Sequence, residues 1–170
     1  GMPKVGPFEL TEARALFEAE SAALAAPIIT DEALTELEGF IDAMTGKGKS
    51  RNIGHEEADR LFHLTIAKAT NNAAIIYTID NMWKMRSEAM EVQTVYESVC
   101  HSDDLLLEKE HRAILEALRA RDSGAARKAM RAHFTRMIEA LLEASEEEAY
   151  QEVKRKASES RSRFLLTKSM

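Results

Sequence analysis

Apolar residues recur at spacings of three and four along almost the whole chain, as expected for helices that bury one face. Leu34, Leu37 and Ile41, for example, fall on one side of a helix. No segment alternates with the period of two that is typical of strands. Six to seven helices joined by short loops predict an all-α fold, an antiparallel bundle. The predicted helices cover about residues 10–26, 31–44, 55–70, 73–99, 103–120 and 125–150, and the segment 73–99 is one kinked helix or two.

The composition agrees with a single helical domain. The 170 residues include only seven Gly and three Pro, too few for a turn-rich all-β fold, and 45% are hydrophobic, as in soluble globular proteins. The net charge of −6 does not suit binding to a nucleic-acid backbone. The single cysteine, Cys100, excludes an internal disulfide and suits a reducing cytoplasm. The apolar stretch 22–29 is interrupted by Pro27 and is too short to span a membrane.

The chain divides into three predicted parts. Residues 1–9 are expected to be a linker, in which Gly1 before Met2 is a scar of cloning. Residues 10–150 form the helical domain. Residues 151–170 mix Lys, Arg, Ser and Glu, and they are either an extension of the last helix or a tail.

Three of the five histidines lie where a helix should be apolar. His63 follows Asp59 by four residues, so the two side chains are stacked one turn apart. His111 and His133 lie on the apolar stripes of two later helices. A single histidine on such a face is more often a hydrogen-bonded core residue than a metal ligand, but three with a carboxylate are costly to bury without compensation. A divalent cation held by Asp59, His63, His111 and His133 compensates all four, and we prefer this interpretation to four separate buried partners.

The ligand types narrow the choice of metal. Three imidazoles and one carboxylate suit Zn, Ni, Co, Mn or Fe(II), and an octahedral ion would keep two positions open for water or a small carboxylate. Glu108 and His111 form one Glu-x-x-His, half of a di-iron motif. A second copy is lacking, because Arg60 and Met130 stand three residues before the other two candidate histidines.

Other residues carry weaker signals. His55 is expected at an exposed helix start and His101 in a loop. Arg14 and Arg86 are candidate partners for a carboxylate, although either one alone is more commonly a surface arginine with its stem on apolar neighbours. No hydroxyl or thiol has a histidine at a spacing that indicates a nucleophile, and no Gly-rich phosphate loop is present. The sequence therefore does not indicate an enzyme.

Several motifs follow one another in a fixed order. Asp59-x-x-Phe62-His63 is followed by Ala67-x-Ala69-Thr70-x-Asn72. Together with three further motifs they resemble the signature of the FCD domain, the C-terminal ligand-binding domain of FadR-type regulators in the GntR family. The resemblance covers about residues 10–145. The further motifs are Glu12-Ala13-Arg14-x-x-x-Glu18, Glu110-His111-x-x-Ile114-Leu115-x-Ala117-Leu118 and Asp122-x-x-x-Ala126-x-x-x-Met130-x-x-His133.

This resemblance implies a bundle with a central cavity that holds a divalent metal on the same four residues, and effectors that are small organic acids such as hydroxy acids, sugar acids or dicarboxylates. Arg14 matches a family position that often faces the cavity, and Asn72 is the signature asparagine. Both are carried over as ligand-binding residues. Arg86 matches no family position and is a ligand-binding candidate only as an inward arginine that could pair with a carboxylate. Family members place a winged helix-turn-helix before this domain, so DNA binding is expected only through such an N-terminal module. This chain does not contain the module, which is expected either to have been trimmed or to be lacking in the natural protein.

The sequence thus predicts the effector-sensing and dimerisation domain of a bacterial transcription regulator. We expect a cytoplasmic homodimer that binds a divalent transition metal (Zn, Ni, Mn or Fe) and a small organic acid, without membrane contact. Two alternatives remain open at this point. One is a metal-dependent enzyme that acts on a small carboxylate, and the other is a metal-free helical interaction module whose core histidines are satisfied by the protein.

Overall fold

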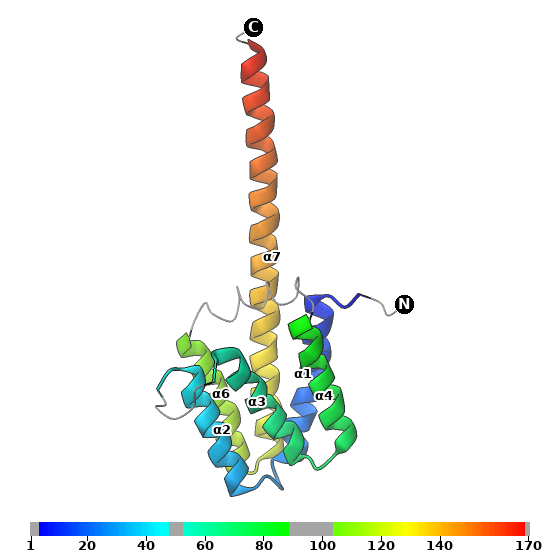
Figure 1. Cartoon of the computed structure of the whole chain (residues 1–170), viewed down its shortest axis with the longest axis vertical. Helices are drawn as coiled ribbons and strands as arrows, with labels where there is room; N and C mark the ends of the chain where they lie inside the picture. Colours follow the sequence, from blue (N-terminus) through cyan, green and yellow to red (C-terminus); the bar gives the residue numbers. More distant parts are fainter. Residues whose placement is uncertain (1–3, 48–52, 89–103, 169–170) are drawn as a thin grey trace.

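The computed structural model describes residues 4–47, 53–88 and 104–168, and this part of the chain is helical and contains no strand. The first half of α7 lies between α1 and α6, and α3 packs against α1, α2 and α4 (Figure 1). The predicted all-α fold is therefore confirmed. The described helices are α1 (Pro7–Ala25), α2 (Asp31–Met44), α3 (His55–Ala69), α4 (Ala73–Glu88), α6 (Asp104–Arg119) and α7 (Ser123–Lys168).

Helix boundaries follow local capping chemistry. The Thr30 side chain accepts a hydrogen bond from the Ala33 amide at 3.1 Å and starts α2 as predicted. Helix α1 begins three residues before the expected Leu10, because Pro7 suits the first turn and the Glu9 carboxylate accepts a hydrogen bond from the Gly6 amide at 3.2 Å. Asn71 takes the left-handed conformation (φ 54°) that ends α3, a role for which asparagine is well suited.

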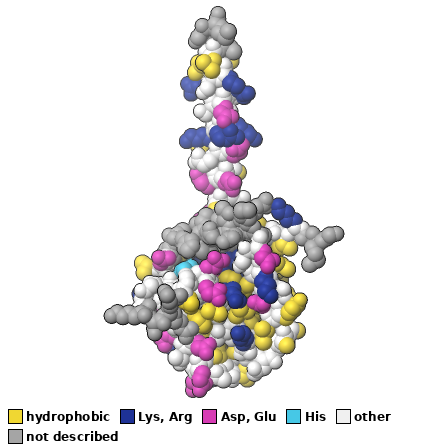
Figure 2. Space-filling model, viewed as in Figure 1, with side chains coloured by type: hydrophobic (Ala, Val, Ile, Leu, Met, Phe, Trp, Pro, Cys, Tyr) yellow, Lys and Arg dark blue, Asp and Glu magenta, His cyan; other side chains and the backbone are white. Residues whose placement is uncertain are grey.

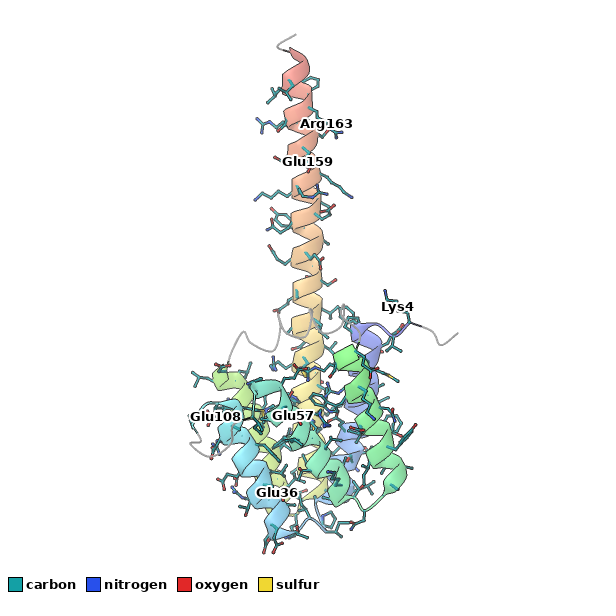
Figure 3. The ribbon with its side chains drawn as sticks, viewed as in Figure 1. Lys4, Glu36, Glu57, Glu108, Glu159 and Arg163 are labelled. Carbon is teal, nitrogen blue, oxygen red and sulfur yellow. The ribbon has the colours of Figure 1, made fainter. Side chains whose placement is uncertain are left out.

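Two of the predicted segments extend differently. The fourth is described as α4 up to Glu88, and its predicted remainder lies outside the described residues. The last helix starts at Ser123 and continues past Tyr150 to Lys168, so residues 151–168 are helical. From Ser145 to Leu166 every side chain is exposed, because this part of α7 projects beyond the bundle (Figures 1 and 3).

The core is apolar with a polar centre. Its largest buried side chains include Trp83, Phe62 and Phe134, and around them lie buried Leu, Ile, Met and Ala residues of α1, α2, α3, α4, α6 and α7. The predicted central cavity is not shown by the described residues. None of the described helices is both long and apolar enough to cross a lipid bilayer.

Candidate metal centre

Three helices bring the four predicted ligands together. Asp59 and His63 come from α3, His111 from α6 and His133 from α7, and all four are buried. Asp59 and His63 share a helix face because they are four residues apart. One nitrogen from each histidine can be chosen so that the three atoms all lie within 4.8 Å of one another. The three predicted histidine ligands thus converge on one point in the bundle, and Asp59 lies beside two of them.

Each imidazole is oriented through its Nδ1 atom. The Nδ1 of His111 is 2.8 Å from the Leu107 carbonyl oxygen, and that of His133 is 2.8 Å from the Glu110 carboxylate. The Nδ1 of His63 is ion-paired with the Glu18 carboxylate. Carbonyl and carboxylate oxygens only accept hydrogen bonds, so Nδ1 carries the proton in all three rings. In a neutral ring this leaves Nε2 as the atom available to a metal, the arrangement that outer partners impose on metal-binding histidines.

Asp59 faces two of these Nε2 atoms. Its Oδ1 is 2.9 Å from Nε2 of His111 and 3.4 Å from Nε2 of His63. Because Nδ1 of His111 already donates its proton, the 2.9 Å contact requires either a second proton on Nε2 or a cation between the two atoms. Burial alone would raise the pKa of Asp59, but hydrogen bonds and charges of His111 and His63 hold this pKa well below its usual value. Asp59 is therefore a carboxylate, which is the form that binds metals.

Both ring nitrogens of His63 are buried and make no well-formed hydrogen bond to a described residue, although Nδ1 is paired with the Glu18 carboxylate and Nε2 is 3.4 Å from Oδ1 of Asp59. An orphaned buried nitrogen is costly unless something outside the protein chain satisfies it. Two donors that bind one ion at about 2.1 Å each lie at most about 4.2 Å apart, so the three histidines need only small side-chain shifts to share a metal. The donor set therefore fits a divalent transition metal.

Burial and charge act in opposite directions on two of the histidines. Burial lowers the pKa of His133 to about 4, so this ring is neutral and able to bind a metal at neutral pH. Burial would also lower the pKa of His63, but the charges and hydrogen bonds of Glu18 and Asp59 outweigh it and raise this pKa to about 9. Conversely, burial would raise the pKa of Glu18, whereas His63 and Arg14 lower it to about 2.

Arg14 and Arg86, the two predicted anion-binding arginines, are buried beside this cluster. The Nε of Arg14 donates a hydrogen bond to Glu18 at 2.8 Å, and Nη1 of Arg86 donates to Asp59 at 3.3 Å. Both guanidinium groups lie against the Trp83 ring, 4.2 and 4.6 Å from its centre. They are thus inward side chains rather than surface arginines.

Asn72, the third predicted ligand-binding residue, lies elsewhere. Its side chain is exposed and accepts hydrogen bonds from the Ala74 and Ile75 amides, at 3.0 and 3.2 Å, as the N-cap of α4. It precedes Arg86 by 14 residues on that helix, which corresponds to about 21 Å. Of the remaining histidines, His55 contacts the Met44 carbonyl at 2.9 Å at the start of α3, and His101 lies outside the described residues.

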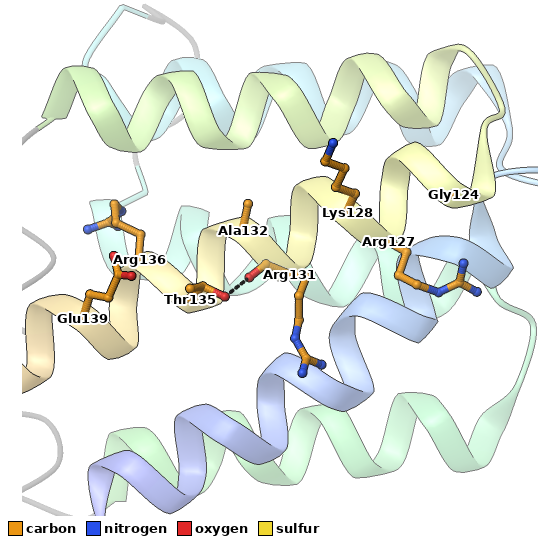
Figure 4. Close-up of a pocket in the computed structure, with 8 residues that line it drawn as sticks. All are labelled: Gly124, Arg127, Lys128, Arg131, Ala132, Thr135, Arg136 and Glu139. Atoms are coloured by element: carbon orange, nitrogen blue, oxygen red, sulfur yellow. Dashed lines mark hydrogen bonds between the residues drawn. The ribbon is translucent and has the colours of Figure 1, made fainter.

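Two carboxylates of the centre were not predicted. Glu18 follows Arg14 by four residues on α1, so a buried ion pair between them could have been suspected from spacing. Glu110 gave no such signal, because its partner His133 is 23 residues away on another helix. Glu110 also pairs with Arg136, which lies at one end of a groove of about 510 Å³ along α7 (Figure 4). This outer groove is lined mainly by Arg127, Lys128, Arg131 and Arg136 and contains none of the three histidines.

The chain belongs to the FCD domain family, whose model matches residues 9–136. This match confirms the resemblance seen in the motifs. It defines the molecule as the FCD domain that is found in GntR-family regulators.

Relatives of known name agree with this assignment. The chain is 35% identical over 146 residues to the Uxu operon transcriptional regulator of Escherichia coli (strain K12), an alignment that covers 82% of this chain and 55% of that protein. It is 33% identical over 131 residues to the Exu regulon transcriptional regulator of the same strain, covering 75% and 48%. The chain spans about half the length of these curated relatives. They are transcriptional regulators and not enzymes, as predicted.

Solved structures share the fold. E. coli McbR/YncC matches with a TM-score of 0.64 over 85% of this chain and 69% of that chain, and at 20% identity this likeness concerns the fold alone. Streptococcus agalactiae GntR matches with a TM-score of 0.59 and 25% identity over 78% and 58% of the two chains.

Proposed function

We propose that this chain is the effector-sensing domain of a metabolite-responsive transcription regulator and that Asp59, His63, His111 and His133 hold a divalent transition metal, Zn, Ni, Mn or Fe. The observation that carries the proposal is the common orientation of the three imidazoles. Each has Nδ1 on an acceptor and leaves Nε2 to its neighbours or to Asp59. This arrangement of ring nitrogens suits a bound cation better than it suits a core without a metal.

The effector is proposed to be a small organic acid. The buried charges of Arg14 and Arg86 are balanced by those of Glu18 and Asp59 when the histidines are neutral. A divalent cation added to this balanced set leaves an excess of positive charge in a low-dielectric centre, which an anion would offset. A bound metal would offer open coordination positions to a carboxylate. Arg14 and Arg86 would bind and orient the rest of that carboxylate as charge-assisted donors.

Regulation would follow from a shift in population. An acid that binds one arrangement of the helices more tightly than another favours that arrangement in proportion to its difference in affinity. In a homodimer this shift would alter the relation between two DNA-binding modules, which belong to a part of the regulator outside this chain.

Metal analysis and calorimetry test both steps. The protein, purified without a histidine tag, should contain or take up one Zn, Ni or Mn per chain. The metal-loaded protein should then bind at least one probe acid among lactate, gluconate and succinate, and the chelator-treated protein should not. Arg86→Gln should keep the metal and lose at least tenfold in affinity for that acid. A protein that takes up no metal would support the metal-free interaction module, and turnover of a probe acid would support the enzyme.

A further inference from the structure

The exposed residues along most of α1 and the turn after it are apolar. Between positions 13 and 28 six residues are exposed, and all but Glu20 are apolar: Leu16, Phe17, Leu24, Pro27 and Ile28. The exposed fractions of the four large side chains lie between 47% and 57%. On α2, by contrast, every exposed residue is polar, and Figure 2 shows acidic side chains at the start of that helix. Soluble monomers rarely expose several large apolar side chains together, so this surface of α1 is suited to binding a partner.

The exposed side chains within the helix share one side of it. At 100° per residue, the four of them span a sector of about 100°, and we call this set the outer face of α1: Leu16, Phe17, Glu20 and Leu24. The same sector also contains the small Ala13 and, near the start of the helix, Glu9, whose carboxylate accepts a hydrogen bond in the cap. The outer face is therefore apolar except for the carboxylate of Glu20.

The outer face contains both a pocket and a projecting side chain. The pocket has a volume of about 290 Å³, opens between α1 and α4, and is lined by Leu16, Phe17, Glu20, Ser21 and Ile75. On the helical wheel Leu24 lies about 10° from the middle of the four α1 residues of the pocket, and along the axis it lies about 8 Å beyond them. A face that carries a pocket and a side chain able to fill it can be complementary to a copy of itself.

The one charge of the outer face is balanced from α7. Nε and Nη2 of Arg127 donate hydrogen bonds to the two carboxylate oxygens of Glu20, at 2.7 and 3.1 Å. Burying a charge is costly mainly when it is left without a partner. A molecule that covers the outer face would therefore bury an ion pair and no unpaired charge.

We propose that two copies of this chain pack against each other through the outer face of α1, with the two helices antiparallel and Leu24 of each copy in the pocket of the other. The two-fold axis then passes close to residue 21, midway between Leu24 and the pocket. Parallel helices would instead place Leu24 opposite Leu24 of the partner subunit and leave both pockets unfilled. The antiparallel arrangement also brings Glu20 and Arg127 of the two copies together near the axis, so that positive and negative groups alternate.

Other partners fit the outer face less well. A nucleic acid is bound through basic groups, and the outer face has no Lys or Arg of its own. A small apolar molecule could fill the pocket but would leave Leu24 and Ile28 in contact with water. A second copy covers the pocket and the projecting side chain at once. The pairing requires neither a metal nor an effector, so it goes beyond the function proposed above and can fail independently of it.

Analytical ultracentrifugation of the full chain tests this interface. The parent protein should be a dimer at micromolar concentration. Leu24→Arg and Leu16→Arg should each raise the dimer dissociation constant at least tenfold, because each places a charge in the apolar contact. Both positions are about half exposed, so the circular dichroism of the variants should match that of the parent protein. Val153→Arg is the control, since Val153 is an exposed apolar residue on the projecting part of α7, and it should leave the dissociation constant unchanged.

Three results would overturn the proposal. The parent protein could be monomeric, or Leu24→Arg could dimerise as tightly as the parent. Weakening by Val153→Arg equal to that by Leu24→Arg would mean that the copies pair through the end of α7. The dissociation constants should be the same in metal-loaded and chelator-treated protein, which separates this experiment from the test of the metal centre.

Cysteine crosslinking tests the antiparallel direction. In a Cys100→Ser background, co-expressed Leu16→Cys and Pro27→Cys chains should crosslink with a short bis-maleimide, because the two positions face each other across the axis. Neither should crosslink alone, since Leu16 lies about 15 Å along the axis from its own copy. Glu36→Cys, on the exposed side of α2, is the control for random collision (Figure 3). Crosslinking of Leu16→Cys alone would indicate a parallel pair, and equal crosslinking of Glu36→Cys would indicate collision; either result would overturn the proposed pairing.

Discussion

Replacement of Glu110 tests whether a residue that orients a metal ligand contributes to metal affinity, separately from its contribution to the stability of the fold. Glu110 does not belong to the four proposed ligands, but its carboxylate accepts the Nδ1 proton of His133 at 2.8 Å and also pairs with Arg136. In Glu110→Ala the His133 ring loses the partner that fixes its tautomer and its direction. Loss of such an outer partner lowers metal affinity about 10- to 100-fold, which corresponds to about 1.4 to 2.7 kcal/mol. Arg136 is partly exposed and can turn to water, so no buried charge is left unpaired.

Glu108 offers a closely matched control. It lies on the same helix, its side chain has the same exposed fraction of 13%, and it pairs with two basic residues, Lys47 and Arg112. It contacts no histidine among the described residues. Glu108→Ala should therefore lower thermal stability about as much as Glu110→Ala does, but should leave metal affinity unchanged.

Competition titration of Ni²⁺ or Zn²⁺ against a chromophoric chelator at pH 7.5 measures the affinities of both variants. His133→Ala in the same assay gives the effect of losing a ligand outright, which should be larger than that of Glu110→Ala. Equal affinities for Glu110→Ala and Glu108→Ala would refute the argument that Nδ1 partners orient these rings toward a metal.

Three further results are expected. In the metal-free protein, the stability that His63 gains from its raised pKa is complete below its ordinary value of 6.5 and is lost as the pH rises through about 9, at most about 3 kcal/mol; chemical denaturation should show this loss in the parent and not in His63→Gln. Asn72→Ala should cost about 1 kcal/mol of stability as a lost N-cap and leave metal affinity unchanged, so a weaker metal site would contradict the placement described above. Trp83, the only tryptophan, is buried with its ring centre 5.6 Å from that of His63, so Ni²⁺ binding should quench its fluorescence in the parent and not in His111→Ala.

The fold was predictable because its signals are local. Apolar periodicity depends only on neighbours within a helix, and caps such as Thr30 act within one turn. The start of α1 was missed by three residues because Pro7 and Glu9 form their cap before the apolar pattern begins. The state of residues 151–168 could not be settled from sequence, since a polar segment with intrahelical ion pairs has no clear apolar period to distinguish helix from tail.

The candidate ligands were predictable for a different reason. An ionisable side chain on an apolar stripe conflicts with its surroundings, and the sequence shows that conflict at Asp59, His63, His111 and His133 without any knowledge of contacts. The same reasoning favoured an inward position for Arg14 only weakly, because a long side chain can reach water from a buried backbone. The same limit applies to Asn72, since a signature residue at a helix start serves the cap and gives no sign of its distance from the core.

Only one of the three groups that orient the imidazoles could be predicted from sequence spacing. The Leu107 carbonyl could have been expected, because it lies four residues before His111 on the same helix. Glu18 and Glu110 instead meet their histidines from other helices, so their role depends on how α1, α6 and α7 pack. Both are acidic residues of a kind that usually faces solvent. Their pKa values are lowered near the core first by the histidines that they contact, His63 and His133, and then by Arg14 and Arg136. A ligand set can therefore be recognised by the cost of burying it, whereas the groups that orient the ligands are identified only once the helices are placed.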